Sequence, residues 1–142
     1  MVMHSTPLIL ALRVLIGGYL ILSGILKLPD LKGFAGIASS YAIVPDRFEE
    51  VSRYMAYLLP IVEVISGAML LVWILPEIAL IFISLSLIIF IAAQLYEMKE
   101  NPDRPNCGCM GTAVELKLSW EHILLDLGML LAVLYMLLQV VI

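Results

Sequence analysis

Charge is scarce in this chain of 142 residues, since Asp, Glu, Lys and Arg together make up only 14% of it. A soluble domain carries about 25% charged residues. Hydrophobic residues reach 63% and the mean hydropathy is +1.07, whereas a soluble domain of this size still exposes about a third of its chain surface to water. The composition therefore excludes a soluble enzyme, a nucleic-acid-binding protein and a disordered chain, and predicts an integral membrane protein. The formal net charge of −4 also argues against nucleic acid as a partner.

Cysteine is equally scarce, because the chain has only Cys107 and Cys109, separated by one glycine. Two cysteines cannot build a disulfide framework, although they can form one redox pair or contribute to a metal site. The residues before Pro7 contain no Lys or Arg, so the positively charged start of a secretory signal peptide is missing. We therefore expect the first apolar run to be a membrane span.

Four apolar stretches reach the length of about 20 residues that a helix needs to cross the hydrocarbon core. One helix from 54 to 96 would be about 65 Å long, twice the core thickness of about 30 Å. The chain is therefore predicted to turn back at Pro76, interpreted as the stop signal of the second span. We predict an all-α fold, a four-helix membrane bundle in a single domain of residues 1–142, with spans at about 8–28, 54–75, 78–96 and 120–142.

Two longer connections lie on one side of the predicted bundle, opposite both termini and the Pro76 turn. Apolar residues at helical spacing occupy positions 31–42 of the first connection. This stretch is too short to span, so an interfacial or re-entrant helix is predicted there. The second connection, 97–118, is a polar loop that holds both cysteines.

Lysine and arginine outside the spans gather on the side of the cysteine loop. By the positive-inside rule, a multi-pass protein of the plasma membrane would then have this loop in the cytoplasm. The residues counted are Lys27, Lys32, Arg47, Arg53, Lys99, Arg104 and Lys117.

Three ionisable residues, Arg13, Glu63 and Asp126, fall inside the predicted spans. Each costs about 2.5–3.5 kcal/mol at the centre of a membrane helix, which makes them functional candidates. Arg13 shares a helical stripe with Gly17, Gly24 and Lys27, and Glu63 shares a face of the second span with Gly67. The glycines of the stripe allow another backbone to approach closely. Either the three charges simply tie the helices together, or they line a polar cavity.

Depth along the spans favours the cavity. At 1.5 Å per residue, Glu63 lies about 14 Å from the cysteine side and Asp126 about 10 Å, whereas Gln94 and His122 lie about 5 Å from it. Tyr19 falls in the same half of the membrane. The polar groups thus descend from the cysteine loop towards Glu63, which we predict to donate a hydrogen bond to a quinone carbonyl or to take up its proton.

The cysteine motif reads Asn-Cys-Gly-Cys-Met-Gly over 106–111. A disulfide between thiols one residue apart closes a small, strained ring, and strained disulfides are labile and oxidising, which suits a relay. Cys107, Cys109 and Met110 could alternatively bind Cu(I), a soft metal. A third interpretation is a glycine turn with two incidental small residues.

The chain resembles the DoxX/MauE group of small four-helix membrane proteins, in particular its MauE-like branch, in the order and spacing of these motifs. The resemblance covers nearly the whole chain and departs from the expected pattern at Met110, where an aromatic residue is usual. The matching positions are Arg13, Gly17, 23–28, 41–45, 60–63, Gly67 and 107–111. The resemblance implies disulfide formation or thiol transfer in the maturation of extracytoplasmic redox enzymes, or quinone-coupled oxidoreductase assemblies.

The leading hypothesis is a thiol-redox protein in which Cys107 and Cys109 exchange electrons with a thioredoxin-like or oxidoreductase partner. A quinone would be the membrane-side cofactor, with no covalent cofactor and no resident metal. Its predicted binding residues are Tyr19, Glu63, Gln94, Asp126, Arg13 and His122. The alternatives are a non-catalytic anchor or quinone-site subunit in a homo- or hetero-oligomer, and a Cu(I) handler. The redox role requires the cysteines outside the cytoplasm, whereas the Lys/Arg count places them inside.

Overall fold

The computed structural model describes residues 7–41, 44–100 and 119–141, and within these ranges it is helical without a strand. Four helices are long and apolar enough to cross a membrane, which confirms the predicted all-α membrane bundle. They are α1 (Pro7–Lys27), α3 (Glu49–Val72), α4 (Pro76–Glu100) and α5 (Trp120–Val141). The short helix α2 (Leu31–Ser39) lies between α1 and α3, flanked by 3₁₀ turns at Leu28–Asp30 and Asp46–Phe48.

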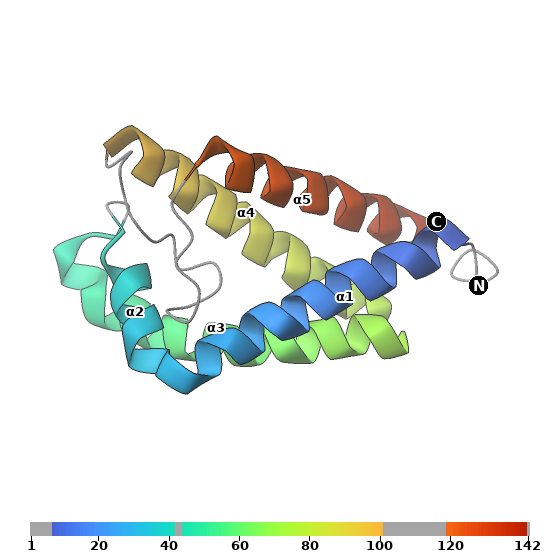
Figure 1. Ribbon diagram of the computed structural model, residues 1–142, viewed down its shortest axis with the longest axis horizontal. Coiled ribbons are helices and arrows are strands. Elements are labelled where there is room, and N and C mark those ends of the chain that lie inside the picture. The colour runs from blue at the N-terminus through green and yellow to red at the C-terminus, as the bar shows by residue number, and fades with distance from the viewer. Residues whose placement is uncertain (1–6, 42–43, 101–118, 142) are drawn as a thin grey trace.

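The four long helices run up and down, so that α1 begins and α5 ends at the same end of the molecule, beside the turn from α3 to α4 (Figure 1). The helix α2 lies at the opposite end. α1 packs mainly against α3 and α4 packs mainly against α5, while α1 and α5 have few contacts. The bundle is therefore built from two helix pairs.

The turn between α3 and α4 differs from the prediction in the role of Pro76. Proline was expected to stop the second span, but α3 already ends at Val72, and Trp73 follows in the left-handed conformation at φ 64°. Pro76 is instead the first residue of α4. Proline suits a first helical position, because the amide hydrogen it lacks would have no partner within the helix there.

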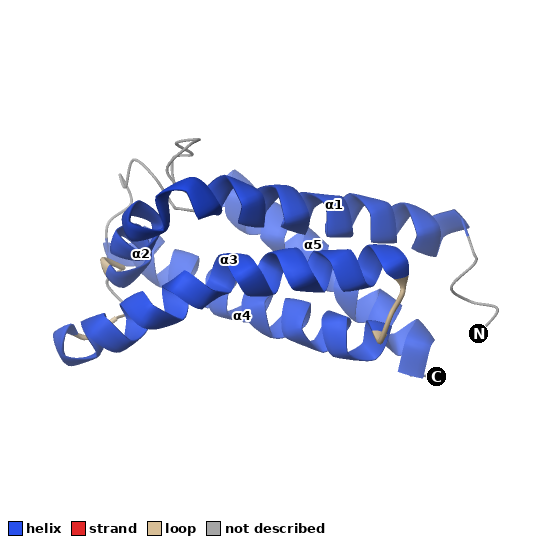
Figure 2. Cartoon of the chain, turned by 90° about the horizontal axis from the view of Figure 1, so that it is seen from below, coloured by secondary structure: helices blue, strands red, loops and turns tan. Residues whose placement is uncertain are grey.

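The short helix α2 is amphipathic and lies across the start of α3 (Figure 2). The Asp30 side chain caps its N-terminus by accepting a hydrogen bond from the Gly33 amide at 3.0 Å. Phe34 and Ala35 are buried against Ala56 of α3. With nine residues, α2 cannot span a membrane, which agrees with the predicted short helix, although it ends at Ser39 rather than near residue 42.

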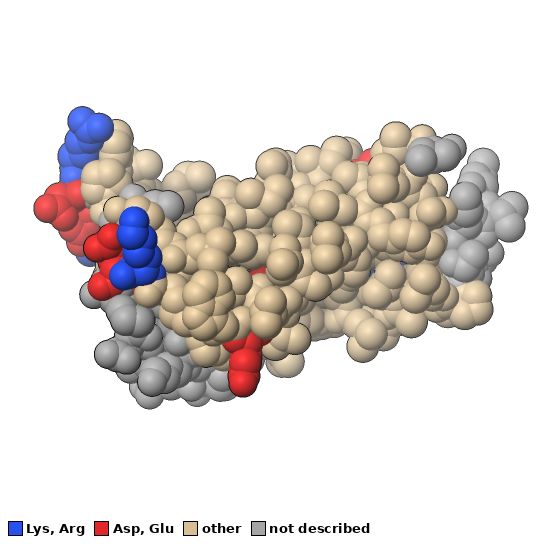
Figure 3. Space-filling view, turned by 90° about the horizontal axis from the view of Figure 1, so that it is seen from above, with Lys and Arg blue, Asp and Glu red and all other residues tan. Residues whose placement is uncertain are grey.

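The outer surface is apolar along the helices, whereas charged side chains gather mostly at the end of the molecule that holds α2, the start of α3 and the end of α4 (Figure 3). Large aliphatic residues such as Leu15, Ile89 and Leu125 are more than 60% exposed on three different helices. Such a surface suits a lipid solvent, and the chain accordingly fits a multi-pass membrane protein.

Candidate functional site

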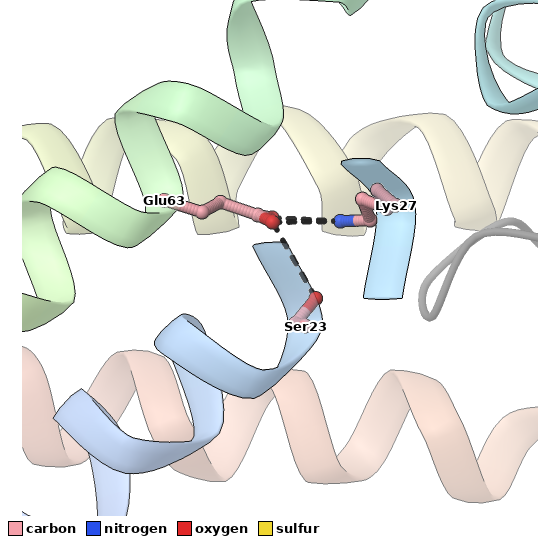
Figure 4. Close-up of polar contacts among 3 residues, drawn as sticks. All are labelled: Ser23, Lys27 and Glu63. Atoms are coloured by element: carbon pink, nitrogen blue, oxygen red, sulfur yellow. Dashed lines mark hydrogen bonds and ion pairs between the residues drawn. The ribbon is translucent and has the colours of Figure 1, made fainter. Parts of the chain in front are cut away.

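The centre of the candidate site is an ion pair inside the bundle, between Lys27 of α1 and Glu63 of α3 (Figure 4). The Lys27 Nζ atom lies 2.9 Å from both carboxylate oxygens of Glu63. The Ser23 hydroxyl donates to the same carboxylate at 3.4 Å. Lys27 is 1% exposed and Glu63 is 6% exposed, so the pair is shielded from both water and lipid.

The packing of α1 on α3 explains why these two side chains meet. The helices are antiparallel, with Gly17 opposite Gly67 and Gly24 opposite Pro60. In that register the α-carbons of Lys27 and Glu63 are offset by about 9 Å along the axis, at 1.5 Å per residue. Each side chain leans towards the N-terminus of its own helix. On antiparallel helices the two therefore lean towards each other and close the gap.

Two aromatic rings complete the enclosure of the lysine. The Lys27 Nζ atom lies 4.9 Å from the centre of the Phe34 ring on α2 and 5.4 Å from that of Phe90 on α4. A cation within about 6 Å of a ring face is attracted to it. The ammonium group is thus held by elements of α1, α2, α3 and α4 together.

A second acidic group, Asp126 of α5, lies near this pair. Gln94 of α4 is within hydrogen-bonding reach of the Asp126 carboxylate, and both His122 and Lys27 interact with it electrostatically. Gln94 is fully buried, as is Glu97 one turn further along α4. Gln94 and Glu97 therefore lie on an interior face of α4.

A cavity of about 40 Å³ lies between these groups. It contains three of the predicted quinone-binding residues, Tyr19, Glu63 and Asp126, and Lys27 also lines it. Its volume is far below the roughly 150 Å³ that holds a benzene-sized ligand, although a water needs only about 10–15 Å³. In this conformation the polar cavity accommodates water-sized molecules and not a quinone ring.

A second, apolar pocket of about 290 Å³ lies between α2, α3 and α4. It shares two lining residues, Ser86 and Phe90, with the polar cavity. Its volume is close to the lower end of the range typical of small-molecule sites, about 300–1,000 Å³. A quinone ring would fit in this pocket.

Arg13, predicted to belong to the quinone site, does not line either space. Its guanidinium group donates hydrogen bonds to the backbone oxygens of Leu70 and Leu71, at 3.3 and 2.7 Å, and lies 4.5 Å from the Trp73 ring. These contacts satisfy carbonyl groups at the C-terminal end of α3. Arg13 of α1 therefore packs against the C-terminal end of α3 and the start of the α3–α4 turn, at the opposite end of the molecule from α2.

The predicted catalytic pair, Cys107 and Cys109, lies outside the described residues, as does Met110. The segment that carries them joins Glu100, the last residue of α4, to Ser119, just before α5. Both of these junctions lie at the end of the bundle where α2 is found (Figure 1). Within the described ranges, no three His, Cys, Asp or Glu residues are grouped so as to hold a metal ion.

Lys27 is the main functional candidate that the sequence analysis misassigned. It was counted among the cations on the cysteine side, whereas the structure buries it in the bundle and pairs it with Glu63. A usable signal was present, since Lys27 shares the helical stripe of Arg13, Gly17 and Gly24. All four residues of that stripe contact α3.

Comparisons with known proteins agree with this architecture. The family model described as methylamine utilisation protein MauE matches residues 5–139. A relative from Paracoccus denitrificans, methylamine utilization protein MauE, is 27% identical over 122 residues, which cover 85% of this chain and 64% of the relative. The chain thus spans less than two thirds of that relative's length, and no solved structure matches significantly. Because the family model covers all four membrane-spanning helices, the chain belongs to the MauE family.

Proposed function

We propose that this protein is a membrane thiol-redox protein in which Cys107 and Cys109 pass electrons to a lipid-soluble quinone. Oxidation of the two thiols to a disulfide releases two electrons and two protons, and a quinone consumes both when it is reduced to the quinol. The disulfide then exchanges with a dithiol on a thioredoxin-like or oxidoreductase partner, which leaves oxidised. By analogy with the name of its relative, we propose a plasma-membrane protein that serves methylamine utilisation.

The Lys27–Glu63 ion pair carries this proposal. Burying two charges is costly unless they are well paired, and ionisable groups inside membranes are concentrated on substrate, ion and proton paths. A structural tie between helices would need only polar, uncharged groups, which are cheaper to bury. A buried pair beside a water-sized cavity is suited to handling the protons that thiol oxidation releases.

The side chains around the cavity supply the elements of a proton path. Glu63 and Asp126 both line the space, so each carboxylate can hold a proton. Lys27 stabilises the charged form of Glu63 through hydrogen bonds to both of its oxygens. Gln94 and His122 both interact with Asp126, and His122 lies in the first turn of α5, so these side chains link Asp126 to the end of the bundle where α5 begins. A proton could therefore move from that end to Glu63 through residues of α5 and α3.

The test is the redox state and the side of the two thiols in intact cells. A membrane-impermeant maleimide is applied with and without prior reduction, and alkylation of Cys107 and Cys109 is followed by gel shift. The proposal expects labelling from outside only after reduction, which indicates an extracytoplasmic disulfide. Free thiols that are labelled only after permeabilisation would overturn the proposal and favour an anchor subunit or a Cu(I) site.

A functional arm completes this test. The single variants Cys107→Ser and Cys109→Ser should each abolish formation of the partner's disulfide in the host. The matched control is Ser40→Cys in the otherwise wild-type protein. This position is exposed and lies outside the long helices, so the variant should leave activity unchanged. Full activity of both cysteine variants would contradict the thiol mechanism.

A further inference from the structure

The apolar pocket between α2, α3 and α4 has a composition that defines its ligand. Aromatic side chains of Phe34, Tyr41 and Phe90 form part of its wall, and small residues, Ala38 and Ala93, leave room between them. Aromatic walls with an otherwise aliphatic lining favour a flat, uncharged ring. The pocket has no charged residue among its described lining residues, so an anionic headgroup would find no ion pair there.

The few polar groups of the pocket are hydroxyls. Three lining residues carry one, namely Tyr41, Ser52 of α3 and Ser86 of α4. A hydroxyl can donate one hydrogen bond, which suits a ligand with carbonyl oxygens on its ring. An acyl chain of a phospholipid would match the apolar wall but would offer these hydroxyls no hydrogen-bond partner.

Two aromatic residues connect this pocket with the buried ion pair. Phe34 and Phe90 both line the pocket, and the same two rings contact the Lys27 ammonium group. A ring bound against Phe90 would therefore lie near the cationic end of the Lys27–Glu63 ion pair. In a low-dielectric interior, the nearer end of an ion pair stabilises a ligand of opposite charge, here one that gains electrons.

We propose that this pocket is the binding site for the ring of a lipid-soluble quinone, held by Phe34, Phe90 and the Ser86 hydroxyl. This assignment rests on the proposed function for the identity of the ligand and adds its location. It moves the quinone out of the polar cavity and leaves that cavity to water and protons.

The experiment measures quinone binding by the full chain in lipid nanodiscs. A photoreactive azido analogue of ubiquinone is cross-linked, the labelled peptides are mapped by mass spectrometry, and the affinity of decylubiquinone is measured by competition. We expect labelling of α2, α3 and α4 at the pocket. Labelling confined to other helices, or co-purified phospholipid that decylubiquinone does not displace, would overturn the assignment.

Two neighbouring alanines of α4 supply a matched pair of variants. Ala93 lines the pocket, whereas Ala92 is exposed on the outer surface. Filling the pocket with Ala93→Phe should weaken binding about tenfold or more, as expected from an overpacking cost of at least about 1.4 kcal/mol. Ala92→Phe should leave binding unchanged. Equal affinities of the two variants, with equal helix content by circular dichroism, would contradict the proposal.

A milder variant guards against misfolding and separates this proposal from the thiol mechanism. Ser86→Ala removes one hydroxyl and should weaken decylubiquinone binding about threefold to tenfold, the range for a single hydrogen bond. Unchanged affinity of Ser86→Ala would overturn the role of that hydroxyl. If the thiols prove dispensable but the quinone binds at the pocket, the thiol mechanism is contradicted and the site assignment stands. If the thiols are required but the pocket is not labelled, the site assignment is contradicted and the thiol mechanism stands.

Discussion

The two helix pairs of the bundle are held together by different means. Between α1 and α3 the backbones touch, because a Cβ atom on Gly24 would lie 2.8 Å from the carbonyl oxygen of Pro60. Between α4 and α5 the contact is made by large side chains, and Gly128 of α5 has open space around it. The buried ion pair belongs to the first helix pair, and the apolar core extends across both.

This difference assigns separate tasks to the two pairs. Helices whose backbones are in contact cannot easily shift relative to each other, so α1 and α3 hold Lys27 and Glu63 in a fixed register. Side-chain packing tolerates small shifts, since rotamers can adjust. The polar cavity lies where the two helix pairs face each other. Glu63 belongs to the rigid pair, α1 and α3, and Asp126 belongs to the pair that can adjust, α4 and α5. A change in the shape of the cavity would therefore come from α4 and α5.

The largest expected effect comes from breaking the ion pair. Lys27→Met keeps most of the side-chain volume but leaves the Glu63 carboxylate buried without its cation. The free energy of unfolding should fall by about 3–5 kcal/mol, the range for a disrupted buried pair. The measurement is unfolding by SDS in mixed micelles, followed by circular dichroism. The double variant Lys27→Met/Glu63→Gln removes both charges and should recover most of the loss.

An exposed ion pair supplies the control for this measurement. Arg53 and Glu49 of α3 are 3.1 Å apart, with side chains about half exposed (48% and 49%). Arg53→Met should cost less than about 1 kcal/mol, as surface pairs do. If Arg53→Met and Lys27→Met proved equally mild, the buried pair would not be what fixes α1 on α3.

A smaller effect is expected from one added methyl group between α1 and α3. Gly24→Ala places a Cβ atom against the Pro60 carbonyl and the Val64 side chain, at 2.8 and 2.6 Å. Backbone cannot yield as a flexible side chain can, so the helices must separate, at a cost of about 1–3 kcal/mol. Gly18→Ala, with nothing within 4 Å, should be neutral or slightly stabilising. A Gly24→Ala protein as stable as Gly18→Ala would contradict the close packing.

Much of this rigid pair could be predicted from the sequence. Helical periodicity alone placed Gly17, Gly24 and Lys27 on one stripe, and placed Glu63 and Gly67 on one face of α3. Both faces are now seen in contact. Periodicity is reliable here because the membrane excludes every spanning structure except helices and closed barrels.

The pairing of Lys27 with Glu63 was not predicted, because Lys27, near the end of the first span, was counted among the cations outside the membrane. The two side chains lean towards each other and bridge the offset between their α-carbons, which the periodicity of separate spans does not reveal. The start of α3 at Glu49, ahead of the expected residue 54, also escaped prediction, since its first turns are polar enough to look like a loop. The apolar pocket depends on how α2 folds back over α3, which no local pattern encodes.

The smallest expected effect concerns the side-chain packing of α4 against α5. Leu80 of α4 is fully buried in the same apolar cluster as Met136 of α5. Leu80→Met exchanges a branched side chain for an unbranched one of similar volume. It should lower the free energy of unfolding by less than about 1.5 kcal/mol, because the neighbouring rotamers can adjust. SDS unfolding should therefore rank Leu80→Met as milder than Gly24→Ala, although the glycine variant adds only a single carbon. The reverse ranking would mean that α4 and α5 form the rigid pair, and the adaptable wall of the polar cavity would then have to be sought on α1 and α3.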